Sequence, residues 1–182
     1  MTLSPVCHNT RPAGALPEQE AAAFDLLERL GIDYDRVSHD AAFNMELCAE
    51  VCRALDVSVC KNLFLCNRQK TNFYLLMMPG DKPFKTKELS HQLGIARLSF
   101  ASPEDMEQYL DCTPGSSSIM GLANDTENKV QLLMDEDIKA GEYLGCHPCI
   151  NTSSLKLRTA DVLETFLPAV HHEPIFVHLT GE

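Results

Sequence analysis

Two consecutive apolar runs limit the folds open to this chain more than any other feature. Residues 59–66 and 72–78 each have the length of a strand, and the polar segment 67–71 separates them. Runs this short and this apolar are typical of strands that are buried on both faces. We therefore expect a hairpin of two largely buried strands, closed by the turn Pro79-Gly80-Asp81.

The sequence around the hairpin alternates irregularly between helical and strand patterns. Residues 18–30 repeat apolar side chains at helical spacing before Gly31, and Asn44 is suited to cap a second helix that ends near Asp56. Further helices are expected at 86–93, 102–110 and 159–167, and strands at 34–38, 97–100, 129–134, around 143, 150–157 and 175–178. This order predicts an α/β fold of α+β character, with a mixed β-sheet flanked by helices.

The length of 182 residues is sufficient for one domain with a sizeable core. Residues 18–182 carry all the expected helices and strands, without an internal repeat or a linker. Residues 1–17 contain three prolines and no periodic apolar pattern. We expect them to form a loose N-terminal arm on a single domain.

The distribution of apolar residues and cysteines indicates a compartment. No run of about 18 apolar residues occurs, as a membrane-spanning helix would need, and residues 1–20 lack the charged start and apolar stretch of a signal peptide. The eight cysteines occur in a chain with enough apolar residues to fold without disulfides, so they are expected to be reduced thiols. These features favour a soluble, cytoplasmic protein with no membrane contact.

The net charge of −11 argues against a protein that binds nucleic acid over a wide surface, because neutralising phosphates requires clustered Lys and Arg. The charges are unevenly distributed, however. Residues 61–97 hold seven basic and two acidic side chains, a local balance of +5 that leaves −16 for the rest. This asymmetry fits either a small contact area for a polyanion or a solvated turn and helix face.

The segment Cys146-His147-Pro148-Cys149 has the spacing of a metal or redox motif. A structural zinc site usually needs two such pairs, and neither Cys48/Cys52 nor His171/His172 completes one. A redox pair would open a helix, whereas residues 150–157 have a strand pattern. Both interpretations are therefore disfavoured, and no metal or cofactor is expected. The C-terminal histidines His171, His172 and His178 are expected to be exposed to solvent.

Two features remain that could carry chemistry. Lys61 lies inside the apolar strand 59–66, where a charge is costly unless it points to solvent or into a cleft. The glycine- and serine-rich turn at 115–118 offers a run of backbone N–H groups. Other motifs fail: residues 80–86 lack the second glycine of a phosphate-binding loop, and residues 115–119 lack the last glycine of a GxSxG elbow.

Five segments in a fixed order carry a resemblance. These are CKNLFL, PGDKPFKTKELSHQLG, LSFASPEDMEQYL, PGSSSIMGL and GCHPCINTSSLKL. Together they resemble the free-standing form of the bacterial-type prolyl-tRNA synthetase editing domain, in the superfamily of YbaK-type proteins. The resemblance extends from about Phe24 to Pro174. It implies a mixed sheet with flanking helices around a small pocket for the amino acid of a misacylated tRNA.

The resemblance also assigns roles to individual residues. Lys61 matches the strand lysine of the family, the glycine-rich loop lies at 115–121, and the GxHP segment lies at 145–148. Two positions depart from the family pattern: Ile119-Met120-Gly121 replaces a PFG-like loop end, and Asn44 stands where a threonine is common. The implied catalytic residues are Lys61, His147, Gly115 and Ser116. The implied substrate-binding residues are Asn44, Asn62, Ser117, Ser118, Gly121, Gly145 and Pro148.

The activity implied by the resemblance is hydrolysis of alanine wrongly attached to proline tRNA. The expected partner is the acceptor end of a misacylated tRNA, and prolyl-tRNA synthetase is a candidate partner; the oligomeric state stays open. In this interpretation Lys61 is an electrostatic clamp, the backbone of 115–118 stabilises the oxyanion, and His147 orients a ribose hydroxyl or a water. Two alternatives remain: another editing substrate such as Cys-tRNA(Pro), and a tRNA- or synthetase-binding module without catalysis.

Overall fold

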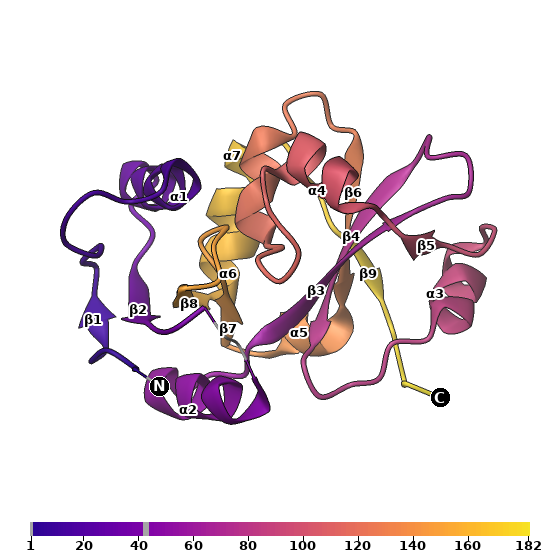
Figure 1. Ribbon diagram of the computed structural model, residues 1–182. Helices are drawn as coiled ribbons and strands as arrows, with labels where there is room; N and C mark the ends of the chain where they lie inside the picture. Colours follow the sequence, from indigo (N-terminus) through magenta and orange to yellow (C-terminus); the bar gives the residue numbers. More distant parts are fainter. Residues whose placement is uncertain (1, 42–43) are drawn as a thin grey trace.

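The expected hairpin is present in the computed structural model, which describes residues 2–41 and 44–182 (Figure 1). Strands β3 (Cys60–Cys66) and β4 (Phe73–Pro79) pair antiparallel along their whole length. The side chain of Asn67 closes the turn, because its Oδ1 accepts hydrogen bonds from the backbone N–H groups of Thr71 and Asn72 at 2.9 and 3.1 Å. Such a local side-chain bond fixes the turn and with it the register of the hairpin.

The hairpin belongs to a five-stranded mixed sheet with the order β5-β3-β4-β6-β9. β5 (Ser99–Phe100) lies antiparallel to β3 at one edge. β6 (Val130–Asp135) is parallel to β4, and β9 (Ile175–Val177) is parallel to β6. The mixed sheet and its flanking helices confirm the fold class expected from the sequence.

The expectation of one sheet was incomplete, because the strands form two. The second sheet is antiparallel throughout and has the order β1-β2-β8-β7. It lies on the left in Figure 1, beside the five-stranded sheet. Its strands are β1 (Cys7–His8), β2 (Tyr34–Ser38), β7 (Tyr143–Cys146) and β8 (Ser153–Arg158).

The two sheets meet at a single β-bridge between Val59 and Gly145. A Cβ atom on Gly145 would lie 3.1 Å from the Cα of Val59 and 3.3 Å from the backbone oxygen of Ser58. These distances are tighter than most carbon contacts, so a side chain at this position would press on the backbone before β3. Gly145 therefore sets how closely β7 approaches the start of β3.

Two helices begin at the capping residues expected from the sequence. The Oδ1 of Asn44 accepts from the backbone N–H of Leu47 at 2.9 Å, and Ser102 caps a later helix in the same way. The expected helix 159–167 contains a π-helical turn, at a point where Pro168 cannot donate the usual backbone bond. The helices are α1 (Glu18–Arg29), α2 (Met45–Leu55), α3 (Thr86–Leu93), α4 (Pro103–Leu110), α5 (Glu136–Ala140), α6 (Thr159–Asp161), α7 (Leu167–Ala169), the 3-10 helix η1 (Ile119–Asn124) and the π-helix η2 (Val162–Phe166).

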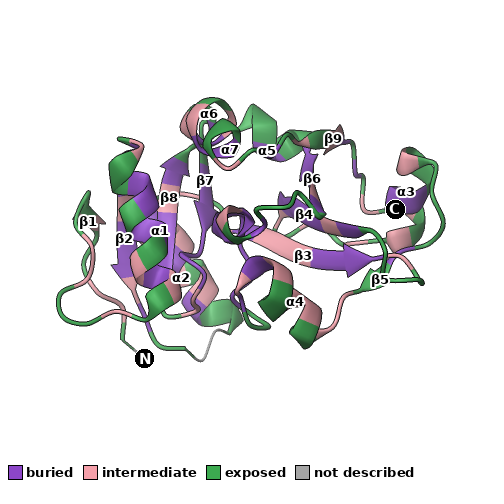
Figure 2. Cartoon of the chain, turned by 90° about the horizontal axis from the view of Figure 1, so that it is seen from above, coloured by how far each residue is buried: buried purple, intermediate pink, exposed green. Residues whose placement is uncertain are grey.

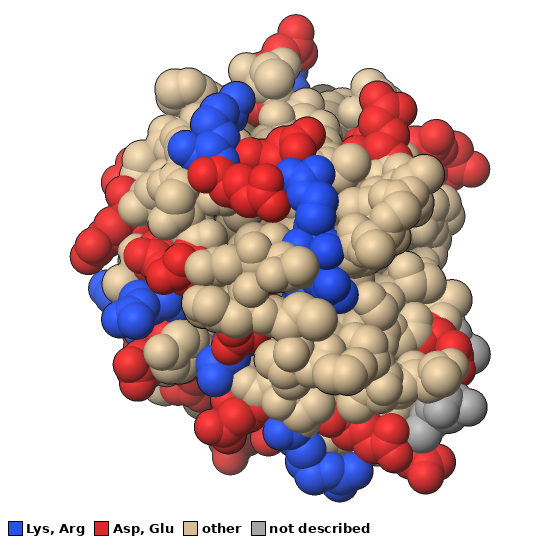
Figure 3. Space-filling model, turned by 90° about the vertical axis from the view of Figure 1, so that its left-hand side faces the viewer, with Lys and Arg blue, Asp and Glu red and all other residues tan. Residues whose placement is uncertain are grey.

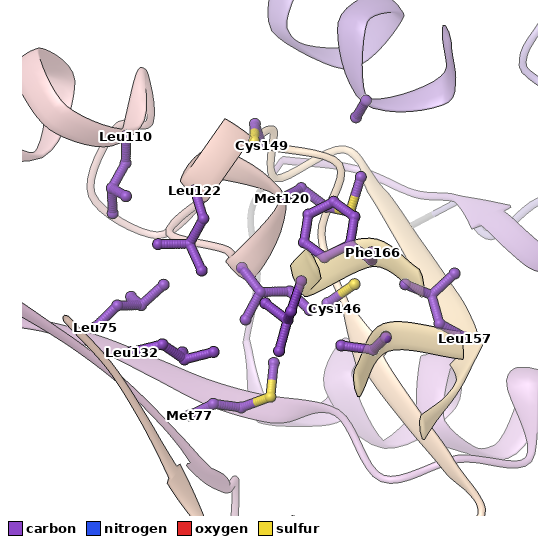
Figure 4. Close-up of a cluster of buried hydrophobic side chains, with 14 of the residues drawn as sticks. Leu75, Met77, Leu110, Met120, Leu122, Leu132, Cys146, Cys149, Leu157 and Phe166 are labelled. Atoms are coloured by element: carbon purple, nitrogen blue, oxygen red, sulfur yellow. The ribbon is translucent and has the colours of Figure 1, made fainter. Parts of the chain in front are cut away.

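The main hydrophobic core fills the space between the two sheets and the helices α1, α4 and η2. Figure 4 shows Leu75 and Met77 of β4 facing Leu122 of η1 and Phe166 of η2, with Cys146 of β7 among them. Figure 2 shows the same division: purple inner strands and largely green outer helix faces. Cys146 and Cys149 thus lie in the core, where free cysteine behaves as a small apolar residue.

The N-terminal segment is attached to the domain and is not the loose arm expected from the sequence. β1 pairs with β2, and Leu3 forms a bridge with His39. Arg11 donates to Asp25 and Glu28 of α1, at 2.7 Å in each case. The sequence of residues 1–17 did not predict these contacts, because their partners lie elsewhere in the chain and leave no local pattern.

His172 was expected to be exposed, but it is buried against Asp125. Its Nε2 lies 2.9 Å from the Asp125 Oδ2, and its Nδ1 donates to the backbone oxygen of Val170 at 2.7 Å. The same carboxylate accepts the backbone N–H groups of Lys129 and Val130. The pair therefore connects the C-terminal segment to the loop that begins β6. His178 lies at the surface as expected.

The face that carries the four-stranded sheet has charged side chains of both signs (Figure 3). Figure 3 shows the side of the molecule that carries the four-stranded sheet, and acidic and basic side chains are interspersed there. This arrangement agrees with the net charge, which leaves little room for an extended polyanion-binding surface. Within the described residues, no helix is both long and apolar enough to cross a membrane.

Candidate active site

A pocket of about 400 Å³ lies at the edge of β3 that the short strand β5 leaves uncovered. β5 pairs only with Leu65 and Cys66, so the first half of β3 borders the pocket instead of another strand. α2, the 80–85 loop, α4, the glycine-rich loop and the GCHP segment supply the other walls. The lining residues are Cys48, Val59, Cys60, Lys61, Asn62, Leu63, Phe64, Gly80, Phe100, Ala101, Met106, Pro114, Gly115, Ser117 and His147.

Five of the residues expected in the site therefore line one pocket: Lys61, Asn62, Gly115, Ser117 and His147. They come from three segments that are far apart in the sequence. The alternation of side chains along β3 places Lys61 on one face of the sheet and Asn62 on the other. The pocket thus wraps around the open edge of the strand and has two sides.

The charged side chain of Lys61 is tolerated in an apolar strand because it lines the pocket and its amine has a hydrogen-bond acceptor. Its Nζ donates to the backbone oxygen of Lys82 at 2.6 Å. Lys82 is itself fixed, because the Nζ of its partly buried side chain donates to Asp135 at 2.7 Å, to Asp137 at 2.8 Å and to the backbone oxygen of Leu179 at 2.7 Å. The loop that receives Lys61 is therefore held by an ion-pair network on the sheet.

The pKa of Lys82 reflects this network. Burial alone would lower the pKa of its amine, but the hydrogen bonds and charges of Asp135 and Asp137 outweigh burial and raise the pKa above its ordinary value. The Asp137 carboxyl has a lowered pKa for the same reason. Lys82 is thus a permanent cation with a structural function, and Lys61 is the pocket's own cation.

Two polar atoms in the pocket wall have no hydrogen-bond partner among the described residues. They are the Oδ1 of Asn62 and the Oγ of Ser117, both buried. Leaving such an atom unpaired costs about 1–3 kcal/mol, so buried polar groups are normally bonded. Two orphaned oxygen atoms in one pocket indicate a place where a ligand supplies the missing donors.

The glycine-rich loop divides its residues between the pocket and the protein interior. Gly115 has a φ of +88°, which favours glycine, and it lines the pocket. Ser116 is turned away: its N–H and its Oγ both donate to the backbone oxygen of Thr113 at 2.9 Å. Ser118 is buried and donates to the backbone oxygen of His147 at 2.5 Å.

Ser118 therefore ties the glycine-rich loop to the GCHP segment. Gly121 also has a packing function, since a Cβ atom there would lie 2.7 Å from the backbone oxygen of Leu110. Neither Ser116, Ser118 nor Gly121 lines the pocket. The hydroxyl of Ser117 and the backbone around Gly115 are the parts of the loop that face it.

His147 is held in one orientation by the backbone. Its Nδ1 lies 2.8 Å from the carbonyl oxygen of Ser153 and donates to it, so the lone pair of the neutral ring is on Nε2. Burial lowers the pKa of His147; the bond to Ser153 opposes this, and the neighbouring His39 adds to it. The Oγ of Ser153 donates in turn to Glu20 of α1 at 3.1 Å. His147 is therefore a neutral imidazole at pH 7.

The remaining expected residues shape the site without lining the pocket. Asn44 caps α2, and Cys48, one helical turn further on, is the α2 residue that reaches the pocket. Gly145 joins the sheets, and Pro148 is buried beside His147. Sequence reasoning missed Cys48, Phe100 and the apolar wall, because apolar residues in helices and strands carry no signal that separates a pocket from a core.

The cysteines of the CHPC segment are poor candidates for chemistry. Burial raises the pKa of the Cys146 thiol far above its ordinary value. The pKa of Cys149 is raised as well, first by a hydrogen bond with Cys112 and then by burial. Such thiols stay protonated at neutral pH and are weak nucleophiles. Within residues 2–41 and 44–182, no three His, Cys, Asp or Glu side chains cluster in a way that could hold a metal ion.

The close contact at Gly145 predicts a large difference between two glycine substitutions near β7. Gly145→Ala should lower the free energy of unfolding by about 1–3 kcal/mol, because the methyl group would push β7 away from Val59. Gly141→Ala is the matched control, since a Cβ there would make contacts of 3.4 Å or more. Urea denaturation of both variants measures the difference, and equal stability would contradict the steric explanation.

Comparison with known proteins places this chain in a family. The family described as the aminoacyl-tRNA editing domain matches residues 39–165, which are 127 of the 182 residues. The matched region contains Lys61, the glycine-rich loop and the GCHP segment. It omits α1, which carries Glu20, and the C-terminal strand β9.

Individual relatives agree with the family match. "Prolyl-tRNA editing protein ProX" of Acetoanaerobium sticklandii is 27% identical over 145 residues, covering 80% of this chain and 88% of the relative. "Prolyl-tRNA synthetase associated domain-containing protein 1" of Danio rerio is 29% identical over 155 residues, covering 84% and 83%.

A solved structure shares the fold. It is described as "a putative trans-editing enzyme for prolyl tRNA synthetase" and superimposes with a TM-score of 0.66 at 13% identity, covering 91% of this chain and all of the other. The chain therefore belongs to the aminoacyl-tRNA editing domain family, and its enzyme class is that of the aminoacyl-tRNA deacylases.

Proposed function

We propose that this protein acts in trans to hydrolyse the ester of alanine wrongly attached to proline tRNA. The observation that carries the proposal is the pocket at the edge of β3, where a lysine, a neutral histidine and two unpaired buried oxygen atoms lie together. The names of the relatives, which refer to prolyl-tRNA editing and to prolyl-tRNA synthetase, support the choice of tRNA. Prolyl-tRNA synthetase itself is the candidate partner.

The small pocket suits the logic of editing. Binding alone separates side chains that differ by a methylene or two by only about 10- to 200-fold, so a synthetase site for proline also admits alanine. A second, smaller site can accept alanine and exclude proline. Apolar side chains, among them Met106 and Ala101, border the pocket and limit the size of the side chain that enters.

The unpaired oxygen atoms fit the charged part of the amino acid. The α-ammonium of an aminoacyl ester has three N–H donors, and the Oδ1 of Asn62 and the Oγ of Ser117 are two acceptors without a partner. An ammonium held there has its ester carbonyl directed along the wall formed by the glycine-rich loop.

The chemistry is attack of a water molecule on the ester carbonyl, which places negative charge on the carbonyl oxygen. Backbone N–H groups near Gly115 and Ser117 are the candidate donors to that oxygen. The N–H of Ser116 is bonded to Thr113, so it is not among them. The bond between the carbonyl carbon and the ribose oxygen then breaks, and the ribose oxygen takes up a proton.

Lys61 and His147 have different functions in this proposal. Lys61 binds a phosphate of the terminal nucleotides as an electrostatic clamp, because an ammonium is a poor nucleophile. His147, with the lone pair on Nε2, orients the water or the ribose hydroxyl. A hydroxyl of the tRNA assists, so no side-chain triad is needed.

Two alternatives are kept as outcomes of one experiment. Purified protein is incubated with Ala-, Cys-, Ser- and Pro-tRNA(Pro) and with Ala-tRNA(Ala), and release of the amino acid is measured. We expect Ala-tRNA(Pro) to be hydrolysed fastest and Pro-tRNA(Pro) to persist. Faster release of cysteine would establish the other editing substrate. Binding without hydrolysis of any of the five would establish a binding module.

The clamp predicts a strong effect of removing one amine. Lys61→Ala should reduce the rate of deacylation by at least about 100-fold, because the substrate loses the charge that positions it. The melting temperature should change little, since Lys61 donates only to the backbone oxygen of Lys82. Arg68→Ala, in the exposed hairpin turn, is the control for a general loss of positive charge. Full activity of Lys61→Ala would rule out the clamp.

The lowered pKa of His147 predicts the pH dependence of the enzyme. A free histidine becomes protonated near pH 6.5, whereas His147 stays neutral to a lower pH. The acid limb of the pH–rate profile should therefore be centred below pH 6.5. Because the unfolded chain takes up this proton first, stability should fall as the pH drops through 6.5 and level off below the folded pKa.

The variant His147→Asn tests whether both effects come from this one histidine. It should remove both the acid limb and this part of the pH-dependent stability, which urea denaturation at pH 7 and pH 5 measures. An acid limb centred above pH 6.5 would be inconsistent with the buried, neutral ring.

A further inference from the structure

Phe100 lies at the rim of the pocket, and the proposed hydrolysis gives its aromatic side chain no function. It is 65% exposed, which makes it the most exposed aromatic residue among those described. It belongs to β5, the edge strand beside the pocket, which Figure 2 colours as exposed. Exposed apolar residues scattered over a surface need no explanation. Phe100 differs because its ring is part of the pocket wall.

The ring of Phe100 is held in place on one side. Phe84 packs against it edge-on, with 6.0 Å between the ring centroids and an interplanar angle of 68°. Phe84 in turn packs against the second core cluster, which includes Leu65 and Leu98. Phe100 is therefore a braced ring with an open surface, and the protein loses little conformational freedom when a flat ligand covers it.

The register of the strands places Phe100 on the Lys61 side of the pocket. Phe100 is paired with Leu65, and paired residues project to the same face of a sheet. Lys61 and Leu65 are four residues apart on β3 and share that face, about 13 Å apart along the strand. Asn62 projects to the opposite face, where Ser117 and His147 complete the pocket.

The pocket therefore has a side with acceptors and a side with a cation and an aromatic ring. An aminoacylated nucleotide has the same division: an amino acid on one end of the ribose, and a phosphate and a base on the other. The cation on that side is Lys61, which lines the pocket.

We propose that Phe100 is the stacking platform for the terminal base of the tRNA, and that Phe84 braces it. This inference rests on the proposed function, since it assumes an aminoacylated acceptor end in the pocket. Unpaired bases stack on aromatic side chains without regard to sequence. The stacked base fixes the ribose between Lys61 and His147, so Phe100 acts in binding and leaves the chemical step to the other side of the pocket.

The experiment changes Phe100 of the enzyme and the terminal base of the substrate, first separately and then together. KM and kcat are measured for the aminoacyl-tRNA that the wild type hydrolyses fastest, with the terminal adenine present or with that nucleotide lacking its base. Phe100→Leu keeps an apolar side chain but removes the ring, and Phe100→Trp keeps a ring. Ile95→Ala is the control for loss of an exposed apolar residue outside the pocket.

We expect Phe100→Leu to raise KM about 10-fold with little change in kcat, and Phe100→Trp to retain wild-type KM. Removal of the base should raise KM for the wild type by a similar factor and should add nothing in Phe100→Leu. Unchanged KM in Phe100→Leu, or an equal effect of base removal in both proteins, would overturn the inference.

A binding measurement separates failure of this inference from failure of the proposed function. A short single-stranded oligonucleotide with the acceptor-end sequence carries 2-aminopurine at its last position, and stacking quenches its fluorescence. Quenching by the wild type but not by Phe100→Leu supports the platform even if no aminoacyl-tRNA is hydrolysed. Equal quenching by both proteins refutes the platform even if deacylation is confirmed.

Discussion

The close approach of β7 to Val59 at Gly145 is the contact on which the rest of the site depends. It joins the two sheets and brings the GCHP segment to the beginning of β3. His147 then lies on the same pocket as Lys61 and Asn62, although 85 residues separate Asn62 from His147 in the sequence. Ser118 also connects the glycine-rich loop to the GCHP segment, because its hydroxyl donates to the backbone oxygen of His147. The active site is thus a consequence of how two sheets meet.

The hairpin and most helices could be predicted from the sequence because their signals are local. The polar segment at 67–71 and the cap at Asn44 each act within a few residues, and the structure places the turn and the helix there. The division into two sheets could not be predicted in this way. It depends on the pairing of β2 with β8, which joins Tyr34 to Leu157 across most of the chain.

In the candidate site, too, the features that depend on long-range contacts could not be predicted from local sequence patterns. Lys61 and His147 were found because their residue types are unusual in their surroundings, and a resemblance placed them in order. Phe100 was missed, since a phenylalanine in an apolar strand is ordinary until the short pairing of β5 leaves it exposed. The prediction that His172 is exposed was wrong. Its partner Asp125 lies 47 residues away, and no local sequence pattern predicts their interaction.

The network around Lys82 connects the C-terminal segment to the candidate site. Lys61 rests on the backbone oxygen of Lys82, and the amine of Lys82 is bound by the backbone oxygen of Leu179 and by Asp135. Leu179 lies beyond the region that defines the family. The position of the Lys61 amine is therefore linked, through Lys82, to a backbone oxygen near the end of the chain. The side chain of Leu179 is itself buried in the second core cluster, so packing limits which residues fit at that position.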